Sequence, residues 1–303
     1  MKAFLFTTFA LVAFAFNSIL CRLALRGDEA DAAGFTLVRL VSGAVALVVI
    51  SYVVNKGRNL SGSEGVSDAT NTQAKNTLPT GRVSAFMLRG SWPSAFFLFA
   101  YAICFSFAYL GLTAGTGALI LFGSVQMTMI VVAMLKGERP SPLEWLGLLV
   151  AIGGLVYLVF PGLASPPMVS SLLMAAAGMA WAGYTLRGKG SSDPLADTTG
   201  NFVRSLPFAL IIAVIYLPDL QLSTRGIVLA VLSGAVTSGI GYTVWYAALK
   251  YHTSTRAAVL QLAVPVIAAV LGILMLGEMA TLRLGIAAAL ILGGIGLTIL
   301  SRK

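Results

Sequence analysis

The chain has 303 residues, of which 58% are hydrophobic and only 10% charged, and its mean hydropathy is +0.90. A soluble domain carries roughly 25% charged residues because its surface faces water, so this composition excludes a soluble globular protein and predicts an all-α membrane protein. The net charge of +9 would suit nucleic acid, but the basic residues gather in alternate loops, where they report membrane orientation instead. We therefore expect the lipid bilayer as a partner and no nucleic acid.

Long uncharged stretches set the number of predicted spans, since a spanning helix needs roughly 20 apolar residues. The first stretch, 3–21, contains the small pair Ala13-x-Ala15 typical of a cleaved signal peptide, but it stays apolar to Leu20, so we interpret it as a retained helix. Two stretches of double length are divided by glycines at 111–117 and by prolines at 161–167. The ten predicted transmembrane helices lie in 3–21, 34–54, 90–135 (two), 145–186 (two), 199–217, 226–249, 257–277 and 284–301.

The segment 55–89 is polar and has almost nothing to bury, which predicts a cytoplasmic loop between the second and third helices. With the N-terminus inside, 14 of the 20 basic residues fall on the cytoplasmic side. The pattern therefore predicts a multi-pass protein of the cell inner membrane with both termini in the cytoplasm. Cys21 and Cys104 fall at or within helices, so we expect no disulfide.

An internal repeat organises the chain. A shift of 140 residues brings Leu135-Lys-Gly-Glu138 onto Met275-Leu-Gly-Glu278, and Gly153-Gly154 onto Gly293-Gly294. The two repeats are 1–160 and 168–303. Five helices per repeat is an odd number, so the second copy enters the membrane upside down. Inverted repeats of this kind are a transporter architecture, with the substrate site near mid-membrane at their interface.

Several features carry a resemblance to a known family. They are the two Leu/Met-x-Gly-Glu turns, each followed by a glycine-rich helix, together with Trp181 in the sixth helix, Ala247-Ala-Leu-Lys-Tyr251 and Pro265. In this order they resemble the drug/metabolite transporter superfamily, in its ten-helix branch with two EamA-type repeats. Within that branch the chain looks most like bacterial exporters of aromatic amino acids. The first repeat departs from the pattern, with Phe14 at the position of Trp181.

The resemblance implies a monomeric secondary transporter that exports small amphipathic metabolites, aromatic amino acids among them, by alternating access. The alternatives are export of other metabolites or of quaternary ammonium drugs and, in a different class, a membrane-embedded enzyme. Such an enzyme would need an embedded nucleophile or acid–base pair, and the spans offer none. We therefore expect no enzymatic activity.

The sequence predicts neither a cofactor nor proton coupling. The segment Gly183-x4-Gly188-Lys189-Gly190 has glycine where a phosphate-binding loop needs Ser or Thr, and it ends a helix instead of following a strand. The lone His252 has no companion metal ligand. All eleven acidic residues lie in loops or at helix ends, whereas a proton-coupled exchanger usually needs a titratable group inside the membrane. Gradient-driven movement fits this inventory.

The predicted substrate site combines polar and aromatic side chains inside the spans. Unsatisfied polar groups are costly in hydrocarbon, so Asn17, Gln126 and Gln261 mark the interface between the repeats. Aromatic side chains recur on the third, sixth and eighth helices, and such faces can stack against a planar substrate or a cation. The predicted site is Asn17, Tyr101, Gln126, Trp181, Tyr184, Tyr242, Trp245 and Gln261.

Two further patterns give structural expectations. Arg39 and Arg204 lie inside predicted spans, and we expect them to extend to the lipid headgroups instead of pairing with a substrate carboxylate. Small residues four apart, at Gly226, Ala230 and Gly234 and again at Gly285, Ala289 and Gly293, predict close helix packing within the monomer. Pro265 is expected to kink or weaken the ninth helix.

Overall fold

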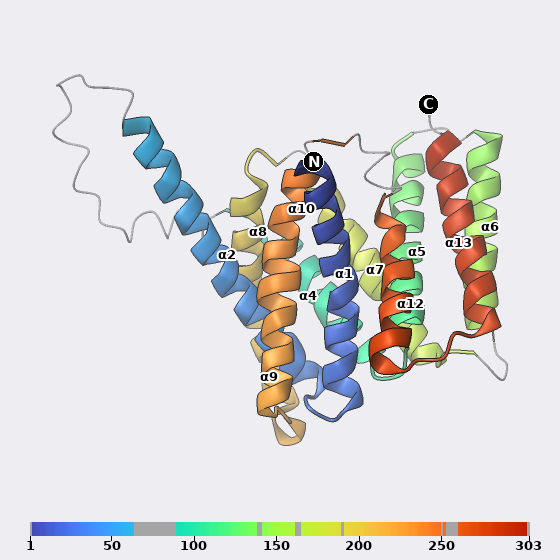
Figure 1. Ribbon diagram of the computed structural model, residues 1–303, viewed down its shortest axis with the longest axis horizontal. Coiled ribbons are helices and arrows are strands. Elements are labelled where there is room, and N and C mark those ends of the chain that lie inside the picture. Colours follow the sequence, from blue (N-terminus) through green and yellow to red (C-terminus); the bar gives the residue numbers. More distant parts are fainter. Residues whose placement is uncertain are drawn as a thin grey trace.

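The computed structural model describes residues 2–63, 89–137, 141–160, 165–188, 191–249, 251–252 and 260–301. These residues form a bundle in which successive spans run in alternating directions, with α9, η2 and α10 forming one span (Figure 1). No β-strand occurs among them, although an isolated antiparallel bridge joins Ala30 to Leu222. The helices are α1 (Lys2–Arg26), α2 (Ala32–Ser63), α4 (Trp92–Ala108), α5 (Ala114–Leu135), α6 (Pro142–Val159), α7 (Met168–Gly188), α8 (Pro194–Ile215), η1 (Leu217–Asp219), α9 (Thr224–Val231), η2 (Leu232–Ile240), α10 (Gly241–Leu249), α12 (Ala263–Leu276) and α13 (Leu282–Ser301).

The helices have the lengths and composition that a bilayer requires. Within the described residues, eight helices are long and apolar enough to cross a membrane, counting α9, η2 and α10 as one, and α4 and α12 are shorter apolar helices of 17 and 14 residues. Because hydrocarbon offers no hydrogen-bond partner, a spanning segment must satisfy its backbone internally, as a helix does. The expectation of an all-helical, multi-pass membrane protein is confirmed.

Helix ends follow local signals. Ser141 begins α6 with a capping box: its hydroxyl accepts from Glu144 N at 3.3 Å, and Glu144 Oε2 accepts from Ser141 N at 2.6 Å. Two boundaries differ from the sequence expectation. Helix α2 continues to Ser63, into the predicted loop, whose remainder at 64–88 lies outside the described residues, as does Glu138. The ninth span is interrupted at Leu262, and Pro265 lies in the first turn of α12, where its missing N–H needs no partner.

Glycines allow some helices to touch through their backbones. A Cβ added to Gly226 would lie 2.1 Å from the carbonyl oxygen of Glu29, and one added to Gly234 would lie 2.1 Å from that of Arg39. The expected close packing is therefore confirmed for α9 against the turn between α1 and α2, and for η2 against α2. The expectation is wrong for Gly285 and Gly293, because a Cβ added to either residue would have no neighbouring atom within 4 Å. Helix α13 turns a different face toward α6.

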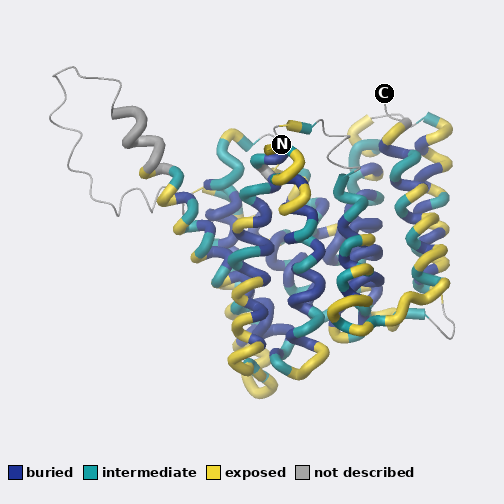
Figure 2. The backbone as a smooth tube through the Cα atoms, in the orientation of Figure 1, coloured by how far each residue is buried: buried dark blue, intermediate teal, exposed yellow. Residues whose placement is uncertain are grey.

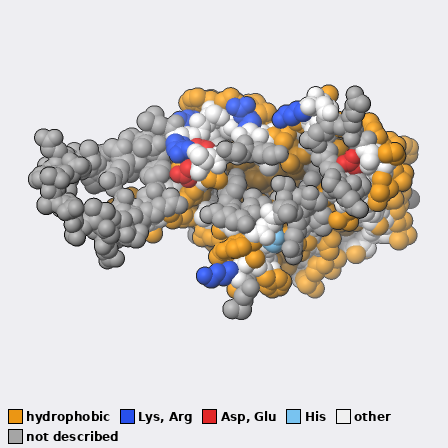
Figure 3. Space-filling model, turned by 90° about the horizontal axis from the view of Figure 1, so that it is seen from above, with side chains coloured by type: hydrophobic (Ala, Val, Ile, Leu, Met, Phe, Trp, Pro, Cys, Tyr) orange, Lys and Arg blue, Asp and Glu red, His pale blue; other side chains and the backbone are white. Residues whose placement is uncertain are grey.

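The bundle buries its inner turns and exposes its outer ones (Figure 2). Large apolar side chains remain exposed on the outward faces, including Leu149 at 62% and Val169 at 71%, as expected for side chains that contact lipid. Both termini lie at the same end of the bundle (Figure 1). Figure 3 looks onto that end, where charged side chains appear on the end face while hydrophobic side chains make up most of the margin.

We predict that Gly234→Ala destabilises the protein, because its Cβ would overlap the Arg39 carbonyl and push η2 away from α2. Overpacking of this kind costs about 1–3 kcal/mol, which a lower melting temperature in detergent would reveal. Gly293→Ala is the matched control, since its Cβ meets open space. Equal melting temperatures for both variants would contradict this account of the α2–η2 contact.

Candidate functional site

A cavity of about 440 Å³ lies in the middle of the bundle. Its lining combines side chains of α1, α4 and α5 from the first half of the chain with side chains of α7, η2 and α10 from the second. It therefore lies between the first and second halves of the chain. None of the described residues that line it is charged, and apolar atoms make up most of its surface.

All eight residues of the predicted site line this single cavity. Six of them are buried, and Trp181 and Gln261 are partly buried. Gln261 differs slightly from expectation, because it lies at a break just before α12 begins at Ala263. Their contact with a substrate stays a prediction. The eight predicted residues, all of them in the cavity lining, are Asn17, Tyr101, Gln126, Trp181, Tyr184, Tyr242, Trp245 and Gln261.

Trp181 is the centre of the aromatic wall. Its ring centroid lies 4.9 Å from that of Tyr101, 5.4 Å from Tyr184 and 5.1 Å from Tyr242. Phe14 extends the wall, with its centroid 5.9 Å from that of Trp245. These separations are typical of favourable ring pairs, so the rings hold one another in place and leave their remaining faces to the cavity.

A polar network closes the deep side of the cavity. Asn17 Oδ1 accepts hydrogen bonds from Ser233 Oγ at 2.6 Å and Thr237 Oγ1 at 3.3 Å, and Asn17 Nδ2 donates to Tyr101 Oη at 3.2 Å. Ser233 and Thr237 belong to η2, a nine-residue π-helical segment. Such segments are frequent at functional sites. Here the segment directs its hydroxyls toward α1 and α2 within an otherwise apolar span.

Arg39 does not extend to the headgroups, which corrects the sequence expectation. Its side chain is buried, with the residue 2% exposed. Its Nη2 donates to Tyr101 Oη at 3.1 Å and to Ser238 Oγ at 3.5 Å, and its Cζ lies 5.0 Å from the Phe105 ring centroid. A sequence gives the depth of a residue but not the direction in which its side chain points. Arg204, by contrast, lies midway along α8, and its side chain donates to the carbonyls of Arg89 and Gly200.

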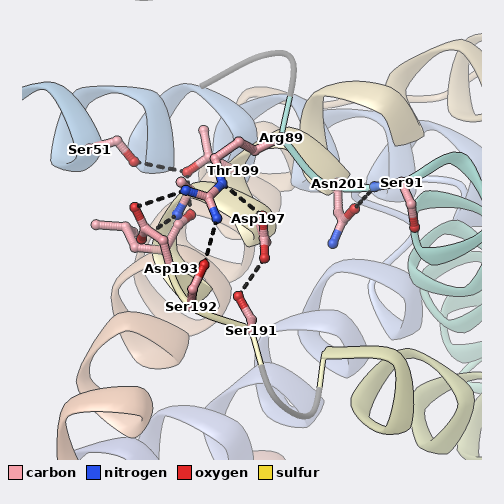
Figure 4. Close-up of polar contacts among 12 residues, drawn as sticks. Ser51, Arg89, Ser91, Ser191, Ser192, Asp193, Asp197, Thr199 and Asn201 are labelled. Atoms are coloured by element: carbon pink, nitrogen blue, oxygen red, sulfur yellow. Dashed lines mark hydrogen bonds and ion pairs between the residues drawn. The ribbon is translucent and has the colours of Figure 1, made fainter. Parts of the chain in front are cut away.

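The cavity opens at the end of the bundle that carries the termini. There its lining includes the exposed Thr185 and Gly188. A polar cluster holds the adjacent start of α8 (Figure 4). Arg89 Nε donates to Asp197 Oδ1 at 3.2 Å, Arg89 Nη2 donates to Ser192 Oγ at 3.0 Å, and the lining residue Ser191 donates to Asp197.

The opposite end is closed by contacts among three segments of chain. Arg22 Nε lies 3.5 Å from Glu278 Oε1, and Arg22 Nη1 donates to the Tyr109 carbonyl at 2.9 Å. Both carboxylate oxygens of Glu278 accept from Ala114 N, at 3.0 and 2.9 Å, so this residue caps α5 from the other half of the chain. Burial raises the pKa of the Glu278 carboxyl above its ordinary value, and the Ala114 N–H and Arg22 oppose that rise.

Comparison with known proteins agrees with this architecture. Residues 168–300 match the model of the EamA-like transporter family. An uncharacterized protein of Pseudomonas aeruginosa is 43% identical over 301 residues, a match that covers 99% of this chain and 96% of the relative. The second half of the chain therefore carries an EamA-like transporter domain. This membrane transporter also resembles an uncharacterized transporter of Archaeoglobus fulgidus, 27% identical over 216 residues, which cover 68% of this chain and 76% of the relative.

A crystal structure of a protein shares the fold of the transporter over essentially the whole chain. The TM-score is 0.60 at 19% sequence identity, and the match covers 100% of this chain and 97% of the other. Within the described residues of the transporter, no group of three or more His, Cys, Asp or Glu side chains is arranged to hold a metal ion.

Part of the cavity lining of the transporter was not predicted from the sequence. Thr237 and Ser238 were not selected, although they lie with Ser233 inside the uncharged stretch 226–249. Three hydroxyls in one span were the available signal. Val125 and Met129 carry no such signal in the sequence, since an apolar residue that faces a cavity cannot be distinguished by its type from one that faces lipid.

We predict a pH effect at the closed end of the transporter. Because the pKa of Glu278 is higher in the folded than in the unfolded state, the stability it contributes is fully present below the unfolded pKa, about 4.3. That contribution is lost as the pH rises through the folded pKa. The melting temperature of the wild type, relative to Glu278→Gln, should therefore fall as the pH rises above about 4.3. A constant or opposite difference in a thermal-melt series would contradict this.

Proposed function

We propose that the protein exports small amphipathic metabolites, aromatic amino acids in particular, as a secondary transporter that works by alternating access. The observation that carries this proposal is the uncharged, ring-lined cavity between the two halves of the chain. Its volume of about 440 Å³ falls within the roughly 300–1,000 Å³ typical of small-molecule pockets. It lies within one chain, so a monomer suffices.

The proposal includes ten spans arranged as two inverted repeats. Helices α1 and α7 run in opposite directions (Figure 1). The contacts between helices support a symmetry that relates the two halves of the chain. Helix α4 contacts α7 and α8, and its counterparts η2 and α10 contact α1 and α2. Likewise α5 contacts α7, and its counterpart α12 contacts α1. Each of these contacts therefore has a counterpart in the other half, as expected for a pseudo-twofold axis in the membrane plane.

We place the protein in the cell inner membrane with both termini in the cytoplasm. Lys2, Lys56, Lys136 and Arg187 lie near the end of the bundle that carries the termini, and basic residues favour the cytoplasmic side. The arginines of the opposite end are held by the protein: Arg22 pairs with Glu278, Arg225 with Glu29, and Arg283 donates to the Tyr157 carbonyl. On this orientation the cavity opens toward the cytoplasm, the side from which an exporter takes its substrate.

The eight predicted residues have complementary roles in this proposal. The rings of Trp181, Tyr184, Tyr242 and Trp245 stack against the planar part of the substrate. The amides of Gln126 and Gln261 make no side-chain hydrogen bond within the described chain, so they are available to its polar groups. Asn17 and Tyr101 provide a polar contact from the deep side.

The alternatives receive less support. Among the described lining residues there is no carboxylate, histidine or cysteine to act as an acid–base group, which disfavours a membrane-embedded enzyme. A quaternary ammonium drug would find aromatic faces, but the positive charge of Arg39 behind the same wall would repel it.

Trp181→Ala is expected to slow export of labelled tryptophan from proteoliposomes. The substitution removes the central ring of the wall, and ring pairs contribute roughly 0.5–1.5 kcal/mol beyond the area they bury, so the initial rate should fall about 2- to 13-fold. Trp145→Ala is the control, since Trp145 is 45% exposed on α6 and does not line the cavity. Absence of tryptophan flux in the wild type would refute the proposed substrate, and equal flux in both variants would refute the site.

Transport should not depend on a proton gradient, because no described lining residue carries a carboxylate that could bind and release a proton. Tryptophan flux can be measured with an imposed pH difference and, separately, with an imposed membrane potential. Strong acceleration by the pH difference alone would show that proton coupling occurs through another route.

A further inference from the structure

Arg39 is a buried cation that has no acidic partner among the described residues. Guanidinium groups stay charged in proteins and only donate hydrogen bonds. The ion pairs of the described chain involve Arg22, Arg89 and Arg225, but not Arg39. Its Nη1 is buried and has no hydrogen-bond partner. A charge that is out of water and unpaired is strongly unfavourable, and an ionisable residue inside a membrane protein usually has a functional role.

Arg39 acts on the cavity through Tyr101. The guanidinium does not line the cavity, but Tyr101, Ser238 and Phe105, which it contacts, all do. Tyr101 Oη accepts from Arg39 Nη2 at 3.1 Å and from Asn17 Nδ2 at 3.2 Å. The Asn17 amide is held in this orientation because its Oδ1 accepts from Ser233.

The hydroxyl hydrogen of Tyr101 is consequently free to be donated. Both hydrogen bonds described at Tyr101 Oη use the oxygen as the acceptor, and the described residues provide no acceptor for its hydrogen. The cavity wall thus presents an O–H donor that is polarised by a guanidinium bonded to the same oxygen. Donors of this type bind anions, since hydrogen bonds with a charged partner are the stronger ones.

The remainder of the cavity does not favour a cation. No acidic side chain occurs among the lining residues that the structure describes, and Arg22 already engages Glu278 at the closed end. A carboxylate placed at Tyr101 would offset the charge of Arg39, whereas an ammonium group would find only ring faces and neutral amides.

We propose that Arg39 and Tyr101 form an anion-recognition site at the deep end of the cavity, and that a carboxylate, without need of an amino group, is what the cavity selects in a ring-bearing substrate. This inference rests on the proposed function, in that it assigns a substrate class to the same cavity. Tyr101 binds the carboxylate directly, and Arg39 is a positioning residue that orients and polarises the Tyr101 hydroxyl.

Three ligands of similar shape test the proposal: indole-3-propionate, its neutral amide and the amine tryptamine. Their binding to full-length protein in nanodiscs can be measured by calorimetry. We expect the wild type to bind the carboxylate at least about tenfold more tightly than the amide or the amine, the size of effect expected for a charge-assisted hydrogen bond. Arg39→Gln and Tyr101→Phe should each remove this preference while retaining affinity for the amide.

If Arg39 and Tyr101 had a merely structural role, their substitution would change the affinities for the carboxylate and the amide together. The ratio of these two affinities therefore distinguishes recognition from a structural role. Tyr101→Phe removes only the hydroxyl, so it tests the proposal even if Arg39→Gln fails to fold. Arg204→Gln is the matched control, since Arg204 bonds backbone carbonyls away from the cavity, and it should keep the preference.

Equal wild-type affinity for the three ligands, no binding of the carboxylate, or an unchanged preference in both variants would overturn the inference. The tryptophan flux assay stays separate from this outcome. If the protein transports tryptophan but shows no preference for the carboxylate, the proposed transport stands and the anion site is refuted. If it prefers the carboxylate but transports no tryptophan, the anion site stands and the proposed transport is refuted.

Discussion

A polar group that leaves water inside a bilayer must find its partner within the protein, and this constraint shapes the whole molecule. It forces the backbone into helices, because only these satisfy every amide within one segment. It also gathers the polar side chains of the spans on inner faces, where Asn17, Ser233 and Thr237 bond one another. Arg39 remains incompletely satisfied in this otherwise paired interior.

Where helices touch closely, they do so because side chains are absent. Gly226 and Gly234 bring α9 and η2 onto the backbone carbonyls of Glu29 and Arg39. This contact fixes η2 beside α2, and through it sets the position of the hydroxyls that reach Asn17 and Arg39. The packing of small residues and the construction of the cavity wall are therefore one feature of the structure.

The sequence predicted the helical fold well because charge-free length is a direct consequence of the bilayer. It also selected Asn17, Gln126 and the aromatic residues of the cavity, because polar side chains within a span turn away from lipid and the rings recur on helices that face one another. It misjudged Arg39, Gly285 and Gly293, because the direction in which a residue faces depends on how helices pack. It could not anticipate that Glu278 caps α5, a contact between residues 164 positions apart.

The π-helical winding of η2 has a consequence for the geometry of recognition. In a regular α-helix, residues five apart point about 140° away from each other around the axis, whereas the wider π turn brings them close to alignment. Ser233 and Ser238 are five apart, and one reaches Asn17 while the other reaches Arg39. Regular winding would turn one of these hydroxyls toward another neighbour, so a change that shortened this segment by a single residue could alter ligand choice while hydropathy stayed the same.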